Sequence, residues 1–254
     1  MDLGIRGKTV IVCASSKGIG KGCAAALAEA GCDLVVNGRN EEVLAKTAKE
    51  LRDRYGVKVI EVPGDVSKPE IQKALLSAYP QIDILVNNNG GPPRRDFREL
   101  DRQKIMDGVI GNMITPIELI MALIDGMAER GFGRIVNITS LSVYVPLAGL
   151  DVSSGARAGL TSFLSGIARQ VVSKNVTINN LLPGSIDTDR LRGPGPANET
   201  EEERKKRLSA NIPAKRLGTP EEFGQVCAFF CSVHAGYLTG QNIPIDGGSY
   251  TSAF

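Results

Sequence analysis

The sequence lacks tryptophan and holds a single histidine, His234, among its 254 residues. A hydrolase with a Ser-His-Asp triad would depend on that one side chain, so this class of enzyme is not favoured. Thirty lysines and arginines stand against 28 aspartates and glutamates, which gives no basic excess for nucleic acid or an anionic membrane. No continuous apolar run reaches the roughly 18–20 residues of a membrane span, and no signal-peptide pattern opens the chain. These absences predict a cytoplasmic protein with neither a nucleic-acid nor a membrane partner.

Paired cysteines and metal ligands are also missing. The five cysteines are odd in number and lie in apolar surroundings, which predicts reduced thiols. Cys227 and Cys231 share a predicted helix but have no histidine or carboxylate at ligand spacing, so no metal site is predicted. The hydrophobic content of 42% excludes a disordered chain, and the 29 glycines suggest tight turns between strands and helices.

Short apolar segments alternate with amphipathic ones along the whole chain. Strands are predicted at 8–14, 33–38, 57–66, 82–90, 133–140, 176–184 and 240–248. Helices are predicted at 21–31, 40–56, after Pro69, over most of 98–130, and at 156–172 and 220–233. This alternation predicts an α/β protein with a single Rossmann-type domain over 1–254, in which helices cover both faces of a doubly wound, parallel, seven-stranded sheet.

A Gly/Pro-rich and then highly charged stretch at 190–208 has a different texture. It predicts either a solvated loop with an exposed helix or a mobile substrate lid at about 187–212, over a pocket at the strand ends.

A glycine-containing loop, CASSKGIG at 13–20, joins the first strand to the first helix. Backbone N–H groups and a helix N-terminus at such a turn can receive a pyrophosphate. The residues predicted to contact the nucleotide there are Ser15, Ser16, Lys17, Gly18, Ile19 and Gly20. After the second strand, Arg39 stands where an acidic residue would bind the ribose diol of NAD. Arg39 and Lys17 therefore favour NADP(H) over NAD(H), although Arg39 could also be a plain exposed turn residue.

Several spaced motifs resemble the short-chain dehydrogenase/reductase superfamily, near the bacterial 3-oxoacyl-carrier-protein reductases. The family's TGxxxGxG, NNAG and PGxxxT motifs are matched by CASSKGIG, NNNG at 87–90 and PGSIDT at 183–188, and GDV at 64–66 resembles the segment that flanks adenine. The resemblance covers essentially the whole chain. It implies cofactor contacts by Asp65, Val66, Asn88, Gly90, Pro183, Gly184, Ile186 and Thr188. It also implies a small carbonyl or alcohol substrate and a homo-oligomer, either a tetramer or a dimer.

The catalytic positions depart from the family. The resemblance implies that Ser140 orients the substrate carbonyl and that Asn112 holds a water in a proton relay. The family's Tyr-x-x-x-Lys pair falls on Ser153 and Arg157. A serine hydroxyl is a far weaker acid than a phenol with a pKa of ~10, and a guanidinium with a pKa above ~12 cannot relay a proton. The loop also carries Ala14 for the family's first glycine and Asn89 for the alanine of NNAG.

Three interpretations remain open from the sequence. The first is an oxidoreductase whose proton comes from Tyr144, or from a water held near Ser140, Ser153 and Asn112. The second is a non-catalytic nucleotide-binding pseudoenzyme or scaffold, and the third is a lyase or epimerase on the same fold. The nicotinamide segment PGSIDT favours the first, because a protein that binds only adenosine does not need it. Tyr144 could instead be a packing residue.

The variable segments of the predicted pocket are rich in arginine. An anionic substrate or carrier is one interpretation of this enrichment, and ordinary surface exposure is the other. The arginines concerned are Arg94, Arg95, Arg190 and Arg192.

Overall fold

A computed structural model describes residues 1–193 and 199–252. Its centre is a sheet of seven parallel strands in the order β3-β2-β1-β4-β5-β6-β7. The strands are β1 Thr9–Val12, β2 Asp33–Gly38, β3 Val59–Pro63, β4 Ile84–Asn87, β5 Gly133–Ile138, β6 Val176–Pro183 and β7 Asn242–Ile245. The strand order reverses between β1 and β4, and open parallel sheets bind their ligands beyond the strand ends at this point.

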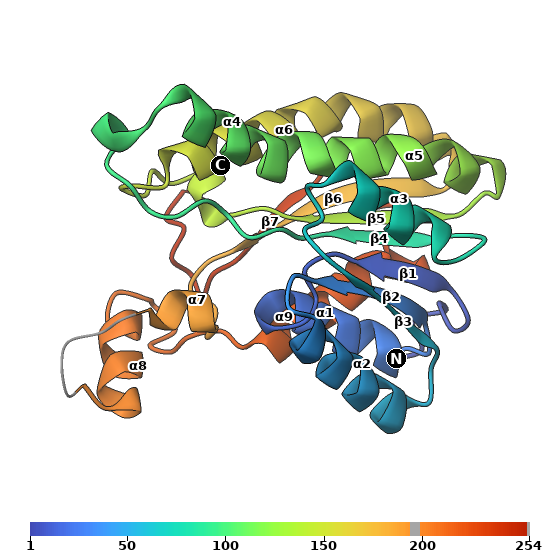
Figure 1. Cartoon of the computed structure of the whole chain (residues 1–254), viewed down its shortest axis with the longest axis horizontal. Helices are drawn as coiled ribbons and strands as arrows, with labels where there is room; N and C mark the ends of the chain where they lie inside the picture. Colours follow the sequence, from blue (N-terminus) through green and yellow to red (C-terminus); the bar gives the residue numbers. More distant parts are fainter. Residues whose placement is uncertain (194–198, 253–254) are drawn as a thin grey trace.

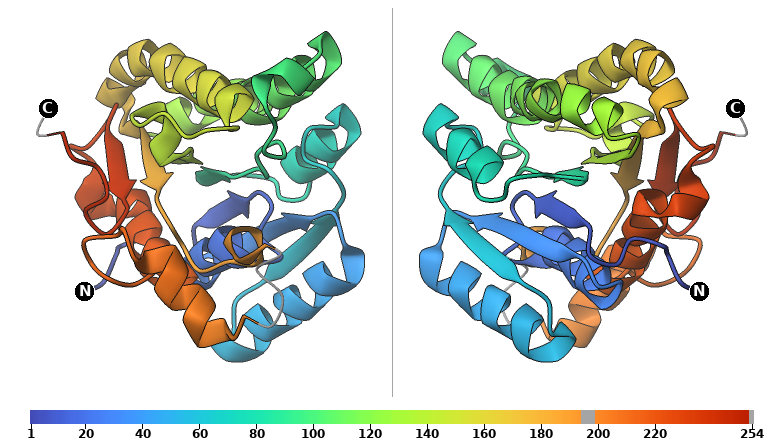
Figure 2. Two further views of the ribbon diagram at one scale, coloured as in Figure 1. Left: turned by 90° about the vertical axis from the view of Figure 1, so that its left-hand side faces the viewer. Right: turned by 90° about the vertical axis from the view of Figure 1, so that its right-hand side faces the viewer.

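Helices cover both faces of the sheet. The helices α1 Gly18–Glu29, α2 Glu41–Tyr55 and α9 Pro220–Cys231 lie on one face, and α3 Pro69–Ser77, α4 Arg102–Val109, α5 Thr115–Glu129 and α6 Asp151–Val171 lie on the other (Figure 1). The views in Figure 2 show the sheet between these two layers. The β1 strand is buried on both faces, and its apolar side chains point alternately to the two sides: Val10 and Val12 join one core cluster and Ile11 joins the other.

Backbone contact between α1 and α9 fixes the first layer. A Cβ on Gly22 would lie 2.0 Å from the carbonyl oxygen of Pro220, and one on Gly224 would lie 2.2 Å from that of Gly22. Only glycine allows the two helices to cross at this distance. Thr219 begins α9 with a capping box that it forms with Glu222.

The predicted α/β fold is confirmed, and all seven predicted strands are present. The β2 strand has the predicted bounds, whereas α6 begins at Asp151 rather than at 156 and therefore includes Ser153. The predicted helix over 98–130 is divided: a π-helical turn, Ile110–Ile114, separates α4 from α5 and contains Asn112. Such turns are frequent at functional sites.

The segment Arg102–Glu129 differs from the expectation that no part of the chain is apolar and long enough for a membrane span. By length and composition alone it could cross a membrane, and 39% of its most apolar part is buried in the protein. A core helix of a soluble protein passes the same test, so the segment alone assigns no membrane contact.

Four asparagines form a ladder across the sheet. Asn87 of β4 donates to Asn137 of β5 at 2.9 Å, Asn137 donates to Asn180 of β6 at 3.0 Å, and Asn180 donates to Asn242 of β7 at 2.7 Å. The three donating side chains are buried, so the ladder satisfies their amides where water is excluded.

Two short helices follow β6, in the region predicted as a lid. They are α7 Asp189–Arg192 and α8 Glu201–Ser209, and both lie beyond the carboxyl ends of the strands (Figure 1). Residues 194–198 of the predicted lid lie outside the described part of the chain. Asp187 holds the two helices together, since it accepts from Arg192 at 2.9 Å and lies 3.6 Å from Lys205.

Candidate functional site

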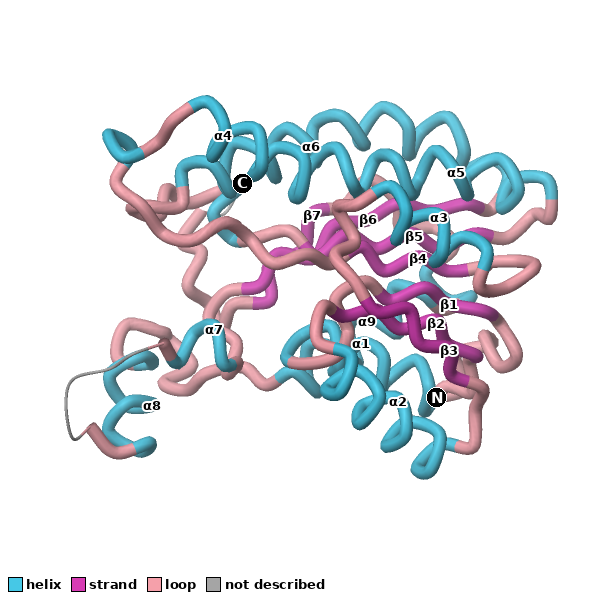
Figure 3. Tube along the Cα trace, viewed as in Figure 1, coloured by secondary structure: helices cyan, strands magenta, loops and turns pink. Residues whose placement is uncertain are grey.

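The loops that follow the strands gather at one end of the sheet (Figure 3), and a cleft of about 1410 Å³ opens there. One end of the cleft, the glycine-loop end, is formed by Ala14 and residues 16–20 with Arg39 and Asp65. The other, the α6 end, holds Ser140, Ser153 and Arg157. Most predicted site residues line this single cleft: Ser16, Lys17, Gly18, Ile19, Gly20, Arg39, Asp65, Val66, Asn88, Gly90, Ser140, Ser153, Arg157, Pro183, Gly184, Ile186 and Thr188.

Three predicted residues are absent from the described lining of the cleft. Ser15 is fully buried below the loop, where its hydroxyl donates to the carbonyl of Val12 at 2.7 Å. Asn112 borders a separate small cavity behind the α6 end. Tyr144 is 39% exposed, and its ring stacks on that of Tyr250 with centroids 5.0 Å apart. The expectation that the segment of Tyr144 lines the pocket is therefore not met for Tyr144 itself.

The glycine loop is shaped by close backbone contacts. A Cβ on Gly20 would lie 2.3 Å from the carbonyl oxygen of Ala14, which also accepts from the Asn88 amide at 3.1 Å. Gly18 has φ +53°, and a Cβ there would lie 3.1 Å from the Thr188 methyl group. The glycine loop therefore lies opposite Thr188, in the segment after β6, and both line the cleft. Ala14 itself has φ +44°, a left-handed conformation that glycine adopts with less strain.

Arg39 and Asp65 lie together where β2 and β3 end. Burial alone would raise the pKa of Asp65, but hydrogen bonds from Ser67 and the nearby charge of Arg39 hold that pKa below its ordinary value. Arg39 forms no ion pair within 4.0 Å among the described residues. Its guanidinium remains available to a phosphate beside the strand end.

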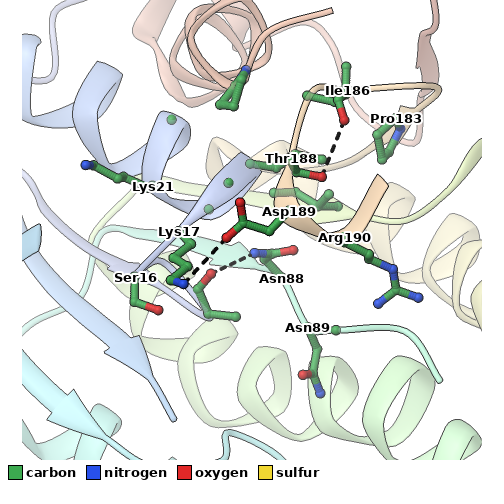
Figure 4. Close-up of a pocket in the computed structure, with 18 of the residues that line it drawn as sticks. Ser16, Lys17, Lys21, Asn88, Asn89, Pro183, Ile186, Thr188, Asp189 and Arg190 are labelled. Atoms are coloured by element: carbon green, nitrogen blue, oxygen red, sulfur yellow. Dashed lines mark hydrogen bonds and ion pairs between the residues drawn. The ribbon is translucent and has the colours of Figure 1, made fainter. Parts of the chain in front are cut away.

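Lys17 points in another direction. Its ammonium lies 3.5 Å from the carboxylate of Asp189, the first residue of α7, and Figure 4 shows this pair spanning the cleft. Both side chains are exposed, so the pair adds little stability. The second cation predicted for a 2′-phosphate therefore lies opposite α7, where its charge is shared with Asp189.

Arg157 is the most constrained cation of the α6 end. It is only 7% exposed, and its guanidinium donates to the carbonyls of Ile138 at 2.6 Å and Asn89 at 3.1 Å, and to the Ser153 hydroxyl at 3.2 Å. Burial lowers the pKa of Arg157 to about 10, and the positive charge of Arg190 adds to the shift. Arg157 therefore stays protonated at neutral pH.

Within the described part of the chain, neither serine hydroxyl of the α6 end donates to an acceptor, and each oxygen accepts one hydrogen bond. Ser140 follows β5, and its oxygen accepts from the N–H of Ser142 at 3.1 Å. The oxygen of Ser153 accepts from Arg157, one helical turn further along α6. A guanidinium that donates to a hydroxyl oxygen strengthens that hydroxyl as a donor. The arrangement can therefore present two O–H donors to one substrate oxygen.

Asn112 is held by the π-helical turn. Its amide N–H donates to the carbonyl of Gly108 at 3.1 Å, while its Oδ1 and the hydroxyl of Thr115 are buried without a partner in the described structure. Both residues border a cavity of about 10 Å³, and Arg157 borders it too. This volume and polarity suit one water molecule.

Sequence reasoning missed the contacts that close the site. Asp189 was not predicted to face the glycine loop. Asn89 was noted only as a departure, yet its side chain donates to the carbonyl of Gly111 in the π-helical turn at 3.0 Å and its carbonyl accepts from Arg157. Arg190 donates to the carbonyls of Gly91 and Pro92 at 2.9 and 3.2 Å. These are contacts between distant segments, for which no local pattern exists.

Comparisons with known proteins agree with this geometry. The family described as enoyl-(acyl carrier protein) reductase matches residues 13–250. The 3-oxoacyl-(acyl-carrier-protein) reductase of Aquifex aeolicus is 32% identical over 254 residues, covering 98% of this chain and 100% of its own length. The L-sorbose reductase of Gluconobacter frateurii, solved with NADPH and L-sorbose, superposes with a TM-score of 0.93 at 29% identity over 99% of this chain and 100% of its own. A 7α-hydroxysteroid dehydrogenase, solved with NADH, superposes at 0.88 with 25% identity over 100% of this chain and 98% of its own. With its fold, its cleft and these relatives in agreement over nearly the whole length, the chain belongs to the short-chain dehydrogenase/reductase superfamily of NAD(P)-dependent oxidoreductases.

Proposed function

We propose that the protein is an NADP(H)-dependent oxidoreductase that interconverts a carbonyl and an alcohol with an atypical active site. The observation that carries the proposal is the single cleft, which joins the glycine loop, the segment 183–188 and the α6 end. The cleft is open beside Gly90, where a Cβ would meet only the Arg190 guanidinium, 3.9 Å away. This free space between the glycine loop and the α6 end supports a bound dinucleotide. The glycine loop would hold the pyrophosphate, and the segment with Thr188 the nicotinamide end.

The preference for NADP(H) rests on Arg39. A guanidinium beside the end of β2 supplies charge-assisted hydrogen bonds to a 2′-phosphate. Titration with NADPH and NADH, followed by nicotinamide fluorescence, is expected to give tighter binding of NADPH. Arg39→Gln is expected to weaken NADPH binding about tenfold and to leave NADH binding unchanged. Equal loss for both cofactors would remove Arg39 from the phosphate site.

The catalytic proposal assigns Ser153 and Arg157 to the positions of the family's tyrosine and lysine. When bound, the nicotinamide supplies the hydride to the substrate carbonyl or accepts it from the alcohol. Ser140 and Ser153 donate hydrogen bonds to the substrate oxygen, and the fixed charge of Arg157 stabilises the negative charge that develops there. The proton then reaches that oxygen from a water near Ser140, Ser153 and Asn112.

A pair of variants distinguishes this proton route from one through Tyr144. Ser153→Ala is expected to lower substrate-dependent oxidation of NADPH, followed at 340 nm, by about 10²-fold. Tyr144→Phe is expected to leave it nearly unchanged, because Tyr144 stacks on Tyr250. Loss of turnover in Tyr144→Phe alone would transfer the acid role to Tyr144.

Two other functions compete with this proposal. A non-catalytic nucleotide-binding pseudoenzyme or scaffold is favoured by Ser153 itself, which offers no phenol to the substrate. A lyase or epimerase would use the bound nicotinamide in a different way. Tight NADPH binding with no absorbance change for any carbonyl or alcohol would favour these alternatives over hydride transfer.

The assembly, the lid and the cellular location also remain proposals. Exposed apolar side chains on the layer of α4, α5 and α6, including Ile105, Met121 and Phe163, support a homo-oligomer, either a tetramer or a dimer. Size-exclusion chromatography with light scattering tests this, and a monomer would contradict it. The bonds of Arg190 to the loop after β4 support a lid that includes α7. The buried free cysteines agree with a reducing, cytoplasmic location.

A further inference from the structure

Three arginines gather at the α6 end of the cleft. Arg157 enters from α6, Arg190 from α7 and Arg94 from the loop after β4, and all three line the same cavity. None of them lies within 4.0 Å of a carboxylate among the described residues. Arg192, on the same short helix as Arg190, is by contrast paired with Asp187 at 2.9 Å. The cluster therefore carries positive charge that the surrounding protein does not neutralise.

The charges of the cluster act on one another. Burial is the main reason that the pKa of Arg157 is lowered to about 10, and the charge of Arg190 is the second. Burial likewise lowers the pKa of Arg190, and the charge of Arg94 adds to this shift. A buried guanidinium beside a second one destabilises the folded protein unless an anion compensates both. The protein holds Arg157 in this position by three hydrogen bonds to fixed acceptors.

The geometry brings the cluster to the reacting groups. A methyl group built on Gly91 would lie 2.9 Å from Nη2 of Arg190 and 3.4 Å from Oγ of Ser153. Nη2 of Arg190 and Oγ of Ser153 therefore both lie beside Gly91, close enough for one small molecule in the cleft to contact both. The glycine loop, where a pyrophosphate would bind, contacts α7 through the pair of Lys17 with Asp189 and does not itself supply a group to the cluster.

We propose that the α6 end binds a carboxylate carried by the substrate close to its reacting carbonyl, so that the substrate is a small oxo acid. This inference rests on the function proposed above and specifies its substrate class. The planar forks of Arg190 and Arg94 suit a carboxylate, while Ser140 and Ser153 hold the carbonyl oxygen. Reduction of such a substrate transfers a hydride from NADPH to the carbonyl carbon and a proton from water to the oxygen; the hydroxide left behind takes up a proton from bulk solvent, and the products are NADP⁺ and the hydroxy acid.

Matched acid and ester substrates test the proposal. The rate of NADPH oxidation is measured with acetoacetate and 2-oxobutanoate, and with the methyl ester of each. We expect kcat/KM for at least one acid to exceed that of its ester by about 10- to 100-fold, the range of a hydrogen-bonded charge pair. Arg190→Gln is expected to remove this preference chiefly by raising KM for the acid. Arg190→Lys is expected to restore part of it, because the charge returns without the fork.

Arg95→Gln is the matched control. Arg95 lies beside Arg94 in the same exposed loop but does not line the cleft, so the variant makes the same change in charge elsewhere. It is expected to keep the preference for the acid. An equal loss in Arg95→Gln and Arg190→Gln would show that general surface charge, and not the cluster, attracts the acid, and would overturn the proposal.

The remaining outcomes separate this proposal from the function on which it rests. If acid and ester react equally, or the ester reacts faster, the carboxylate site is wrong while the oxidoreductase function stands. If neither reacts, binding decides the site: oxalate added with NADPH must raise Tm in the wild type but not in Arg190→Gln, and no rise in the wild type would overturn the proposal. If instead Arg190→Gln weakens NADPH binding and oxalate has no effect in the presence of NADPH, the cluster binds a cofactor phosphate and the proposal is overturned.

Discussion

The glycine-loop end of the cleft depends on glycines that allow close backbone contacts, whereas the α6 end depends on the side chains of Ser140, Ser153 and Arg157. At the first, Gly18 and Gly20 keep Cβ atoms out of contacts as short as 2.3 Å. At the second, the side chains of Ser140, Ser153 and Arg157 line the cleft. We expect a substitution at the glycine-loop end to change nucleotide binding, and one at the α6 end to change the reaction rate. One scaffold can therefore keep its nucleotide while its chemistry changes.

The largest expected effect is the loss of nucleotide affinity when the glycine-loop end is disrupted. Gly20→Ala places a Cβ 2.3 Å from the carbonyl oxygen of Ala14, so the loop must move. NADPH affinity is expected to fall about 10²-fold or more, as measured by nicotinamide fluorescence. Gly166→Ala is the control, because a Cβ on that exposed position of α6 meets nothing within 4 Å. Unchanged NADPH binding in Gly20→Ala would disprove the backbone account of this end.

The next largest effect is a loss of turnover when the α6 end is changed and the glycine-loop end is left intact. Arg157→Gln removes the fixed charge and is expected to lower kcat by about 10²–10³-fold, with NADPH affinity changed far less. It also leaves buried carbonyls without a donor, so the free energy of unfolding should fall by about 1–3 kcal/mol. Arg157→Lys keeps the charge and should retain more activity than Arg157→Gln. Equal kcat in the two variants would mean that charge at this position is irrelevant to turnover.

A smaller effect concerns the strain in the glycine loop. Ala14 has φ +44°, so Ala14→Gly is expected to raise the free energy of unfolding by about 0.5–1 kcal/mol without changing NADPH affinity. Ala30→Gly is the matched control, because Ala30 has φ −72° and the same substitution there should destabilise the protein. Urea denaturation measures both. A loss of stability in Ala14→Gly would show that the turn is relaxed with alanine.

The smallest effect lies outside the cleft, in the layer behind the glycine-loop end. Hydrogen bonds from Arg216 and from the N–H of Thr219 lower the pKa of Glu222 from 4.5 to about 2. A carboxylate with a lowered pKa stabilises the folded state above pH 4.5, and this contribution disappears as the pH falls toward 2. Because Glu222 is exposed, Glu222→Gln is expected to lower the free energy of unfolding by only about 0.5 kcal/mol at neutral pH. Wild type and variant should converge near pH 2, and a pH-independent difference would contradict this account.

The fold was predictable because local patterns determine its elements. The β2 strand extends only one or two residues beyond its apolar run, residues 34–36, and the glycine loop has the close backbone contacts that its spacing implies. The start of α6 was misplaced, because Gly155 and its serine neighbours disfavour a helix in isolation while tertiary packing maintains one. Tyr144 was expected near the pocket, but its partner Tyr250 lies more than a hundred residues away, so no local signal revealed the stacking. The same limit hid the pair of Lys17 with Asp189 and the bonds of Arg157 to Asn89.

In the asparagine ladder across β4, β5, β6 and β7, all three hydrogen bonds run in the same direction. Every amide passes its hydrogen toward β7, so turning one amide around would set two donors or two acceptors face to face at both of its neighbours. The four side chains therefore hold one orientation collectively. Ser140 comes three residues after Asn137, and Gly184 comes four residues after Asn180. The relative height of Ser140 and Gly184 is thus fixed by a row of uncharged amides inside the sheet.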